Sequence, residues 1–329
     1  MNLLKNYNKF LLIFGLILFF FLVKVLPPII QTSVNYAKHY YYFNINPKAE
    51  AAILEKQYKD IFDSNQKVFE QSNQAITDLQ AGKDSAYTVE QQLLVNLNQR
   101  DFYYNQLIKI DNQALKLNLP SVYKDFFKLR VLADKKDYDG FKAYRDGINV
   151  YFTASNALQN YNEAYREFFD QVKKLDISKY SQDQVDIVKY HVKLFEGSYQ
   201  NIAGIADTTD IFNQEILKYI QNMYHIYGFT KDYVNAYEDK DSNKMNESFY
   251  GMTNYLNNNP TQDINAIISR WGTEKLGPYN KKQDELHNSA TDLYHKAYDY
   301  ARKQKLQEIL PVWSSETPGY VENMNPRSI

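Results

Sequence analysis

The fold is decided by residues 141–172, which read FKAYRDGINVYFTASNALQNYNEAYREFFDQV. Every third or fourth position of this stretch lies on one face, and most of those positions are apolar or aromatic. The face comprises Phe141, Tyr144, Ile148, Tyr151, Ser155, Leu158, Asn162, Tyr165, Phe169 and Val172. Such spacing is typical of a packed α-helix, whereas the faces of a strand alternate every two residues. We therefore predict a long helix from about residue 138 to residue 175.

A second long helix is predicted from Asn46 to about Ala81. Asn46 is a suitable N-cap, and Pro47 fits the first helical position, where its missing N–H costs nothing. The inner face of this helix repeats at heptad spacing through Leu54, Tyr58, Ile61, Asn65, Val68, Ser72, Ala75 and Leu79. The Asn and Ser residues on these two faces either set the register of packed helices or face solvent.

Helical periodicity and capping signals cover most of the remaining chain. The predicted helices are residues 88–119, 121–136, 181–205, 210–228, 231–238, 242–256, 262–271 and 278–310. No segment shows the two-residue alternation of a strand. We predict an all-α fold, in which long helices joined by short turns pack as an elongated antiparallel bundle.

Three Lys-Asp pairs are predicted to form turns, at residues 83–84, 136–137 and 240–241. Their spacing favours a repeated helical hairpin, in which residues 122–156 correspond to residues 226–260. Only five positions of that alignment are identical, including Tyr151 with Tyr255. Helical hairpins without common ancestry would show similar turn residues. The spacing therefore indicates either a repeated hairpin or two unrelated hairpins.

The amino-terminal segment is strongly apolar. Residues 10–23 form an unbroken apolar run, and residues 10–30, interrupted by Lys24, would span ~31 Å as a helix, about the thickness of the hydrocarbon layer. A cleaved secretory signal would need small residues before the cleavage site, and residues 26–30 offer none. The pattern therefore favours an uncleaved transmembrane signal anchor over a cleaved signal peptide.

These features predict a division of the chain into five parts. They are a basic leader (1–9), a membrane anchor (10–30), a juxtamembrane segment (31–45), the helical bundle (46–311, with a sub-boundary near 205–210) and a flexible tail (312–329). Lysines near both ends of the anchor are almost balanced, and the short leader favours a cytoplasmic amino terminus. We expect a single-pass protein of a bacterial cell membrane, with most of the chain outside the cytoplasm.

Composition excludes several classes of protein. The 38 Lys and Arg residues balance 39 Asp and Glu residues, which removes the basic signature of a nucleic-acid binder. The chain has no cysteine, which excludes disulfides, thiolate metal sites and a catalytic thiol. No glycine-rich phosphate loop, nucleophile elbow or paired-histidine zinc motif occurs.

Two carboxylate and histidine pairs lie on the last predicted helix. Asp284 with His287, and Asp292 with His295, have the i, i+3 spacing that lets both side chains reach one metal ion. The pairs are ~12 Å apart along the helix and lack further ligands at a matching position. We interpret them as helix surface, and we predict no catalytic, cofactor-binding or metal-ligating residue and no cofactor.

The sequence is compatible with two functions. We expect a membrane-anchored helical scaffold or adaptor that acts at the cell envelope without catalysis, through protein partners or self-association along helix faces. Its lipid partner would be the bilayer around residues 10–30. The alternative is an extracytoplasmic sensor that holds a small molecule or glycan between helices, since 16% of the residues are aromatic. An extended surface stripe would favour the scaffold, and a closed cleft with converging polar groups would favour the sensor.

Overall fold

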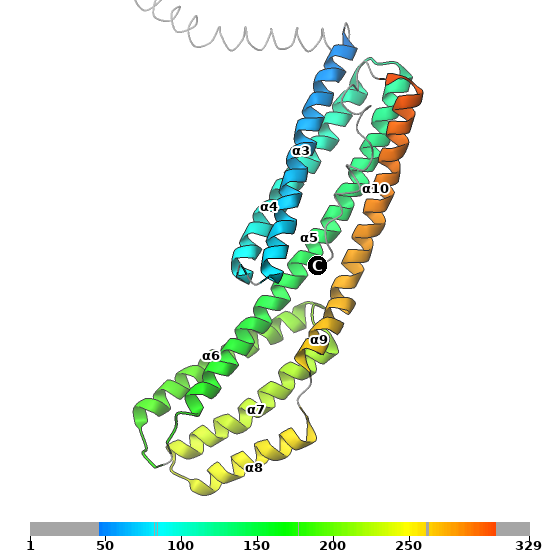
Figure 1. Cartoon of the computed structure of the whole chain (residues 1–329). Coiled ribbons are helices and arrows are strands. Elements are labelled where there is room, and N and C mark those ends of the chain that lie inside the picture. The colour runs from blue at the N-terminus through cyan, green and yellow to red at the C-terminus, as the bar shows by residue number, and fades with distance from the viewer. Residues whose placement is uncertain (1–45, 82, 84, 177, 261–262, 307–329) are drawn as a thin grey trace, which may run out of the picture. The chain divides into compact units, whose positions relative to one another are not determined.

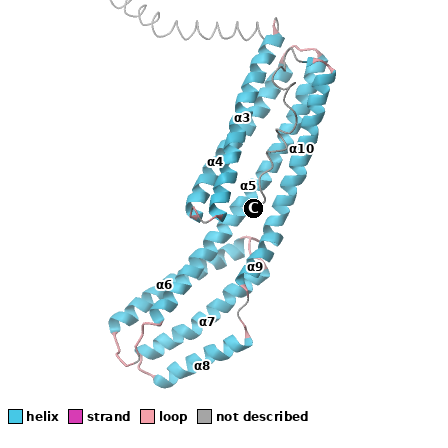
Figure 2. Cartoon of the chain, viewed as in Figure 1, coloured by secondary structure: helices cyan, strands magenta, loops and turns pink. Residues whose placement is uncertain are grey.

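The computed structural model describes residues 46–81, 83, 85–176, 178–260 and 263–306. Within these residues the protein is helical and has no strand, which confirms the predicted all-α class (Figure 2). The elements are α3 (Pro47–Gln80), α4 (Ala86–Lys116), α5 (Ser121–Val172), α6 (Gln182–Thr208), α7 (Gln214–Glu238), α8 (Ser242–Asn258), α9 (Ile264–Trp271), the π-helix η3 (Gly272–Leu276) and α10 (Gly277–Lys303).

Polar side chains begin most of these helices. The Asn46 side chain accepts a hydrogen bond from the Ala49 amide at 3.3 Å, as predicted for the N-cap of α3. Ser85 caps α4 by accepting from the Thr88 amide at 3.2 Å, so this helix begins before the predicted position 88. Asn213 caps α7 by accepting from the Ile216 amide at 2.9 Å. The helix boundaries therefore follow local capping chemistry.

Two predicted breaks are wrong. Helix α5 continues for 52 residues through Lys136 and Asp137, where the sequence predicted a turn. Asp137 is buried, and its carboxylate accepts a hydrogen bond from the Tyr104 hydroxyl at 2.8 Å, so it is held among helices instead of facing solvent. Helix α7 likewise continues through Gly228. By contrast, the chain does turn at Lys240, which has a φ of 58°. The two halves of the suggested hairpin repeat therefore differ in structure.

The described chain forms two compact units. Of the described residues, unit 1 contains 46–138 and 288–306, and unit 2 contains 139–287. Helices α5 and α10 each contribute one part to unit 1 and another part to unit 2. The predicted domain ranges, with their sub-boundary near 205–210, follow a different division and remain a prediction.

Unit 1 is built on the α3 and α4 hairpin, whose helices lie side by side (Figure 1). The first part of α5 and the last part of α10 complete it. Its core joins apolar and aromatic residues from all four segments, including Tyr58, Leu107, Phe126 and Tyr294. Aromatic side chains therefore fill much of the space between the helices of this unit.

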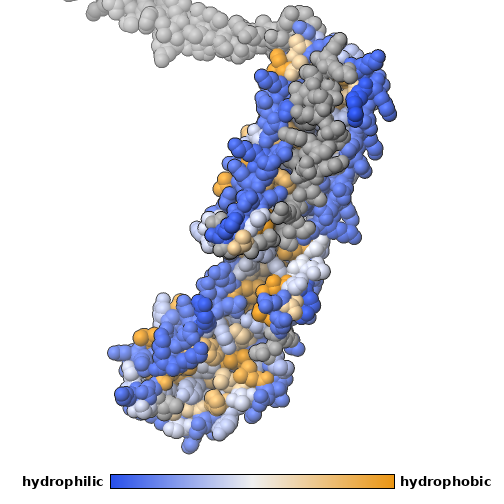
Figure 3. Space-filling view, viewed as in Figure 1, coloured by the Kyte–Doolittle hydropathy of each residue, from blue (hydrophilic) through white to orange (hydrophobic). Residues whose placement is uncertain are grey.

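Unit 2 contains the rest of α5, helices α6 to α9, η3 and the start of α10. Its core is centred on aromatic rings, among which Phe195 contacts Tyr161, Phe168 and Tyr227. The Trp271 indole donates a hydrogen bond to the Ile211 carbonyl at 2.6 Å and so fixes α9 to the segment that precedes α7. On the visible face of this unit, apolar residues gather over α7 and α9 (Figure 3).

The predicted membrane location needs correction. In the part of the chain that the structure describes, no helix combines the length and the apolarity needed to cross a bilayer. Helix α3 is long enough at 34 residues, but its exposed face carries charges such as Lys56, Asp60 and Lys67. The prediction of a single-pass membrane protein is therefore withdrawn. Residues 1–9, 10–30, 31–45 and 312–329 lie outside the described residues.

Candidate functional site

The two carboxylate and histidine pairs of α10 lie in different environments. His287 is buried where α10 passes close to Gly140 of α5. His295 lies two turns further along α10 and is half-buried, and Asp292 is exposed. Among the described residues, no group of three or more metal-binding side chains could hold an ion. The interpretation of both pairs as helix surface is therefore wrong for His287, which is buried, and holds for Asp292, which is exposed.

The strongest concentration of charge is a cluster inside unit 1. The Arg130 guanidinium donates from Nε and Nη2 to Asp111 at 2.5–3.0 Å, and from Nη1 and Nη2 to Glu55 at 2.5 and 2.7 Å. It also lies 3.8 Å from the centre of the Tyr58 ring. The three charged side chains are almost completely buried. One guanidinium therefore binds two carboxylates from two other helices.

A third carboxyl group, that of Asp134, extends this cluster. Its Oδ1 atom accepts hydrogen bonds from the Tyr58 hydroxyl at 2.6 Å and from the Tyr294 hydroxyl at 2.5 Å. Burial, together with the charge of Asp111, raises the pKa of Asp134 well above its usual range. Burial also raises the pKa of Asp111, although the charge of Arg130 opposes that shift. The raised pKa of Asp134 favours its neutral form.

We define the buried cluster as Arg130, Glu55, Asp111, Asp134, Tyr58 and Tyr294. None of these residues is more than 1% exposed, so a substrate has no access to them. The cluster instead joins α3, α4, α5 and α10 through directional bonds. The sequence analysis did not predict this cluster. A signal for it was present, because Asp111 lies between Leu107 and Ala114 on the buried face of α4, where a charged residue is rare and indicates a buried partner.

Of the polar residues on the predicted inner faces, two are fully buried. Asn65 accepts a hydrogen bond from Nε of Arg100 at 3.4 Å, and Ser72 donates to the Val68 carbonyl at 3.0 Å. Arg100 in turn donates to the Tyr104 hydroxyl at 3.2 Å. These contacts place Asn65 in a polar network between α3 and α4, which agrees with the reading that it helps to set their register.

The most unusual surface is a stripe along α6. Helix α6 buries Val185, Val188, Phe195 and Ile202 against unit 2. A second row, spaced alternately four and three residues apart, is exposed along its whole length. This row, which we call the α6 stripe, comprises Asp183, Ile187, Tyr190, Leu194, Gly197, Asn201, Gly204 and Thr208. Its spacing is that of the contact positions of a coiled coil, yet it contacts no partner helix within the described chain.

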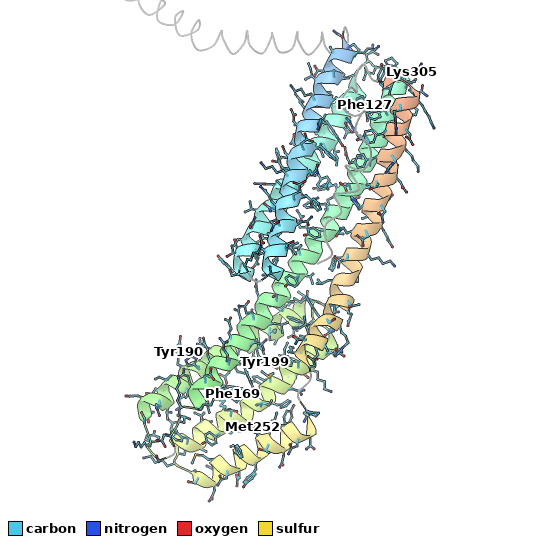
Figure 4. All side chains as sticks on the ribbon, in the orientation of Figure 1. Phe127, Phe169, Tyr190, Tyr199, Met252 and Lys305 are labelled. Carbon is cyan, nitrogen blue, oxygen red and sulfur yellow. The ribbon has the colours of Figure 1, made fainter. Side chains whose placement is uncertain are left out.

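The first half of the α6 stripe carries large apolar side chains. Ile187, Tyr190 and Leu194 are 49%, 60% and 40% exposed. Tyr190 is labelled on this helix in Figure 4. Leaving such side chains in water forfeits the free energy that burial would provide, roughly 1.5–3 kcal/mol for a fully buried one. A row of them at coiled-coil spacing differs from the scattered apolar residues that occur on any protein surface.

The second half of the α6 stripe carries two glycines. A Cβ atom added to Gly197 or Gly204 would meet nothing within 4 Å. Glycine inside a helix costs about 1 kcal/mol relative to alanine, and packing among the described residues does not require it at either position. Gly140 and Gly251 are different, because a Cβ there would come within 3.3 Å of a neighbouring side chain or backbone atom.

The borders of the α6 stripe are chemically distinct. One border is half-buried and includes His191 and Ser198. The other border is exposed and carries Asp186, Lys193 and Asp207. Sequence reasoning identified this helix but missed the stripe, because its apolar spacing is the same as that of a face packed in a core.

Unit 2 also contains an open pocket of about 290 Å³ at the end of α5, between α7 and α8. Phe169 of α5 and Met252 of α8 lie on its walls (Figure 4). The lining residues are Phe169, Val172, Lys173, Leu175, Phe229, Thr230, Tyr233, Ser248, Phe249 and Met252. This volume lies at the lower limit of small-molecule sites, and Lys173 is the one charged residue of the lining.

Comparison with known proteins adds no functional information. No protein-family model, no curated protein and no solved structure matches the chain. A function for this protein must therefore be argued from its own residues and geometry.

Proposed function

We propose that this protein is a non-catalytic helical scaffold that assembles by pairing two copies along the α6 stripe. The observation that supports the proposal is the exposed heptad row itself, with three large apolar side chains in one half and two glycines in the other. Both features reduce the stability of an isolated chain. Both become favourable when a second helix covers the row, because apolar area is buried and the glycines allow close approach.

The distribution of large and small residues favours a second copy as the occupant. In an antiparallel pair centred between Leu194 and Gly197, Leu194 of each copy faces Gly197 of the other. In the same register, Tyr190 faces Asn201 and Ile187 faces Gly204. Every large side chain then meets a small one, which is how packed layers interdigitate without voids.

A parallel pair would lack this complementarity. It would place Tyr190 on Tyr190 and Leu194 on Leu194, while Gly197 and Gly204 would each face a second glycine across a gap. Crowding at one end and a void at the other both cost free energy. The antiparallel register is therefore the one to test.

The size and charge of the α6 stripe set the expected strength of pairing. The packed part, from Ile187 to Gly204, is ~27 Å long, so the contact is smaller than a standard protein interface. On the exposed border, Asp186 of one copy lies near Asp207 of the other, and these carboxylates repel weakly. We therefore expect a reversible dimer with a dissociation constant on the order of micromolar or weaker, which tightens as salt screens the repulsion.

Sedimentation equilibrium of the full-length chain over a wide concentration range tests the proposal. We expect a dimer in the wild type and a monomer in Leu194→Glu, because a buried carboxylate would face Gly197 of the second copy. Val95→Glu is the matched control, since Val95 is also exposed but lies on α4. A wild type that stays monomeric at every concentration, or a dimer that both variants weaken equally, would overturn the proposal.

Introduced cysteines can determine the register, because the natural chain has none. A mixture of Leu194→Cys and Gly197→Cys chains should form the mixed disulfide on mild oxidation. Tyr190→Cys alone should not crosslink, since two Tyr190 residues lie ~16 Å apart along an antiparallel pair. Efficient crosslinking of Tyr190→Cys alone would indicate a parallel pair and contradict the register.

A sensor that holds a ligand between helices remains the alternative. The pocket of unit 2 is open to solvent, and its lining is mainly apolar. A dedicated sensor would need converging polar groups, and the pocket has few of them. The scaffold would need an extended surface stripe, and the α6 stripe extends along almost the whole of its helix. This comparison favours the scaffold.

A further inference from the structure

We propose that the pocket between the end of α5, α7 and α8 binds a small aromatic molecule that carries one negative charge. The proposal does not depend on pairing along the α6 stripe, because the two features share no residue. It rests on three properties of the pocket, namely the arrangement of its aromatic rings, its single cationic side chain and the light packing of α8.

Four aromatic rings line the pocket, and they come from three different helices. They belong to Phe169 of α5, Phe229 and Tyr233 of α7, and Phe249 of α8. Phe169 makes ring contacts with Tyr165 and Phe168 of its own helix, and Phe229 makes one with Tyr255. No ring contact joins any two of the four described rings to each other. The space between them can therefore accept a flat apolar group that touches several rings at once.

Lys173 supplies the charge of the pocket. Its ammonium group is 3.2 Å from the Asp170 carboxylate, but both side chains are more than half exposed. An ion pair of this kind contributes little and exchanges readily with another anion. A carboxylate or sulfonate on the rim would bind Lys173 while the ring of the same molecule enters the aromatic lining.

Helix α8 is the wall that can adjust to a ligand. Only Met245 is buried among its 17 residues. The helix approaches α7 closely at Gly251, where an added Cβ would lie 2.8 Å from Cε1 of Phe229. Met252, a flexible apolar side chain, faces the pocket from the next position. Because Met245 is the one buried residue of α8, small displacements of this wall away from Gly251 disturb little buried packing.

A matched pair of fluorescent dyes tests the proposal on the full-length protein. The anionic probe is 8-anilinonaphthalene-1-sulfonate, and the neutral probe is N-phenyl-1-naphthylamine. We expect saturable binding of one anionic dye per folded chain. Lys173→Gln should weaken the anionic dye about fivefold and the neutral dye less than twofold. Lys179→Gln is the control, since Lys179 is exposed in the same unit and does not line the pocket.

A second set of variants tests the location. Met252→Trp should fill the space and reduce the affinity of both dyes at least tenfold. Phe249→Ala removes an exposed ring and tests the same location if Met252→Trp does not fold. It should reduce the affinity of the dyes about threefold to tenfold. Undiminished dye binding in both variants would overturn the site. An equal effect of Lys173→Gln on the two dyes would overturn the anionic class of ligand.

Discussion

The Tyr294 hydroxyl of α10 donates a 2.5 Å hydrogen bond to Asp134 of α5, and the two residues are 160 positions apart in the sequence. Tyr58 donates to the same oxygen from α3, so three helices of unit 1 meet at one carboxyl group. Burial raises the pKa of both tyrosines well above the usual range, so both remain donors at every physiological pH. This contact fixes the lateral order of the helices more specifically than apolar packing alone.

Asp134→Asn should be tolerated, and its effect should depend on pH. The raised pKa of Asp134 means that the folded state keeps a proton that the unfolded state releases above about pH 4. Stability from this group is therefore fully present below the unfolded pKa and declines as pH rises toward the folded pKa, by about 1.4 kcal/mol per pH unit. Asparagine cannot ionise. Urea unfolding from pH 5 to pH 7 should show the variant gaining stability relative to the wild type.

A stability difference that does not change with pH would identify a different charge state. If Asp134 were ionised in the folded protein over this range, it would be ionised in both states, and the difference between Asp134→Asn and the wild type would stay constant from pH 5 to pH 7. Asp125→Asn provides the control, because the Asp125 side chain is about half exposed on the same helix, where it pairs with Lys128. Its effect on unfolding should be small at every pH in this range.

Arg130→Met should destabilise the protein by about 3–5 kcal/mol at pH 7. The substitution preserves much of the side-chain volume but leaves Glu55 and Asp111 buried without their cation. Adding Glu55→Gln and Asp111→Asn to the same chain should recover a large part of the loss, because no uncompensated charge remains. Urea unfolding of the single and triple variants measures this recovery. A triple variant no more stable than the single one would show that the ion pairs are not the cause.

Gly197→Ala should change folding and pairing in opposite directions. The added methyl group meets open space and improves helix propensity, so the monomer should gain roughly 0.5–1 kcal/mol. The same methyl group should obstruct Leu194 of the second copy and weaken the dimer. Thermal unfolding of the dilute monomer and sedimentation equilibrium measure the two effects separately.

Gly228→Ala is the matched control for that experiment. Gly228 lies inside α7, and its added Cβ would also meet nothing within 4 Å, but it is not part of the α6 stripe. It should stabilise the fold by a similar amount and leave the dimer unchanged. A dimer that Gly228→Ala weakens as much as Gly197→Ala would refute the proposed interface.

Asn213→Ala should cost about 1–2 kcal/mol. Asn213 is buried at the start of α7, and its side chain accepts from the Ile216 amide, which would otherwise lack a partner away from water. Asn235→Ala, at an exposed position of the same helix, should change stability by less than about 0.5 kcal/mol. Denaturant unfolding compares the two, and equal losses would show that the cap has no special role.

The start of a helix could be predicted where its capping residue and its first-turn residues indicated the same position. Asn46 and Pro47 marked the start of α3 correctly, because a cap and a first-turn proline act within a few residues. The turn expected at Lys136 and Asp137 failed because burial of Asp137 against Tyr104 depends on α4, which lies more than thirty residues earlier. A charged pair therefore resembled a solvent-exposed turn until its partner was known.

The sequence by itself determined the all-α class, most helix boundaries, and the apolar faces that repeat every three to four residues. Capping and helical periodicity are local, so they can be read from neighbouring residues. Only the tertiary structure decided which apolar face is buried, as the two faces of α6 demonstrate. It also decided which distant side chains meet, because the partners of Arg130 come from two other helices, α3 and α4. Burial and charge pairing are properties of assembled helices, and local spacing does not specify them.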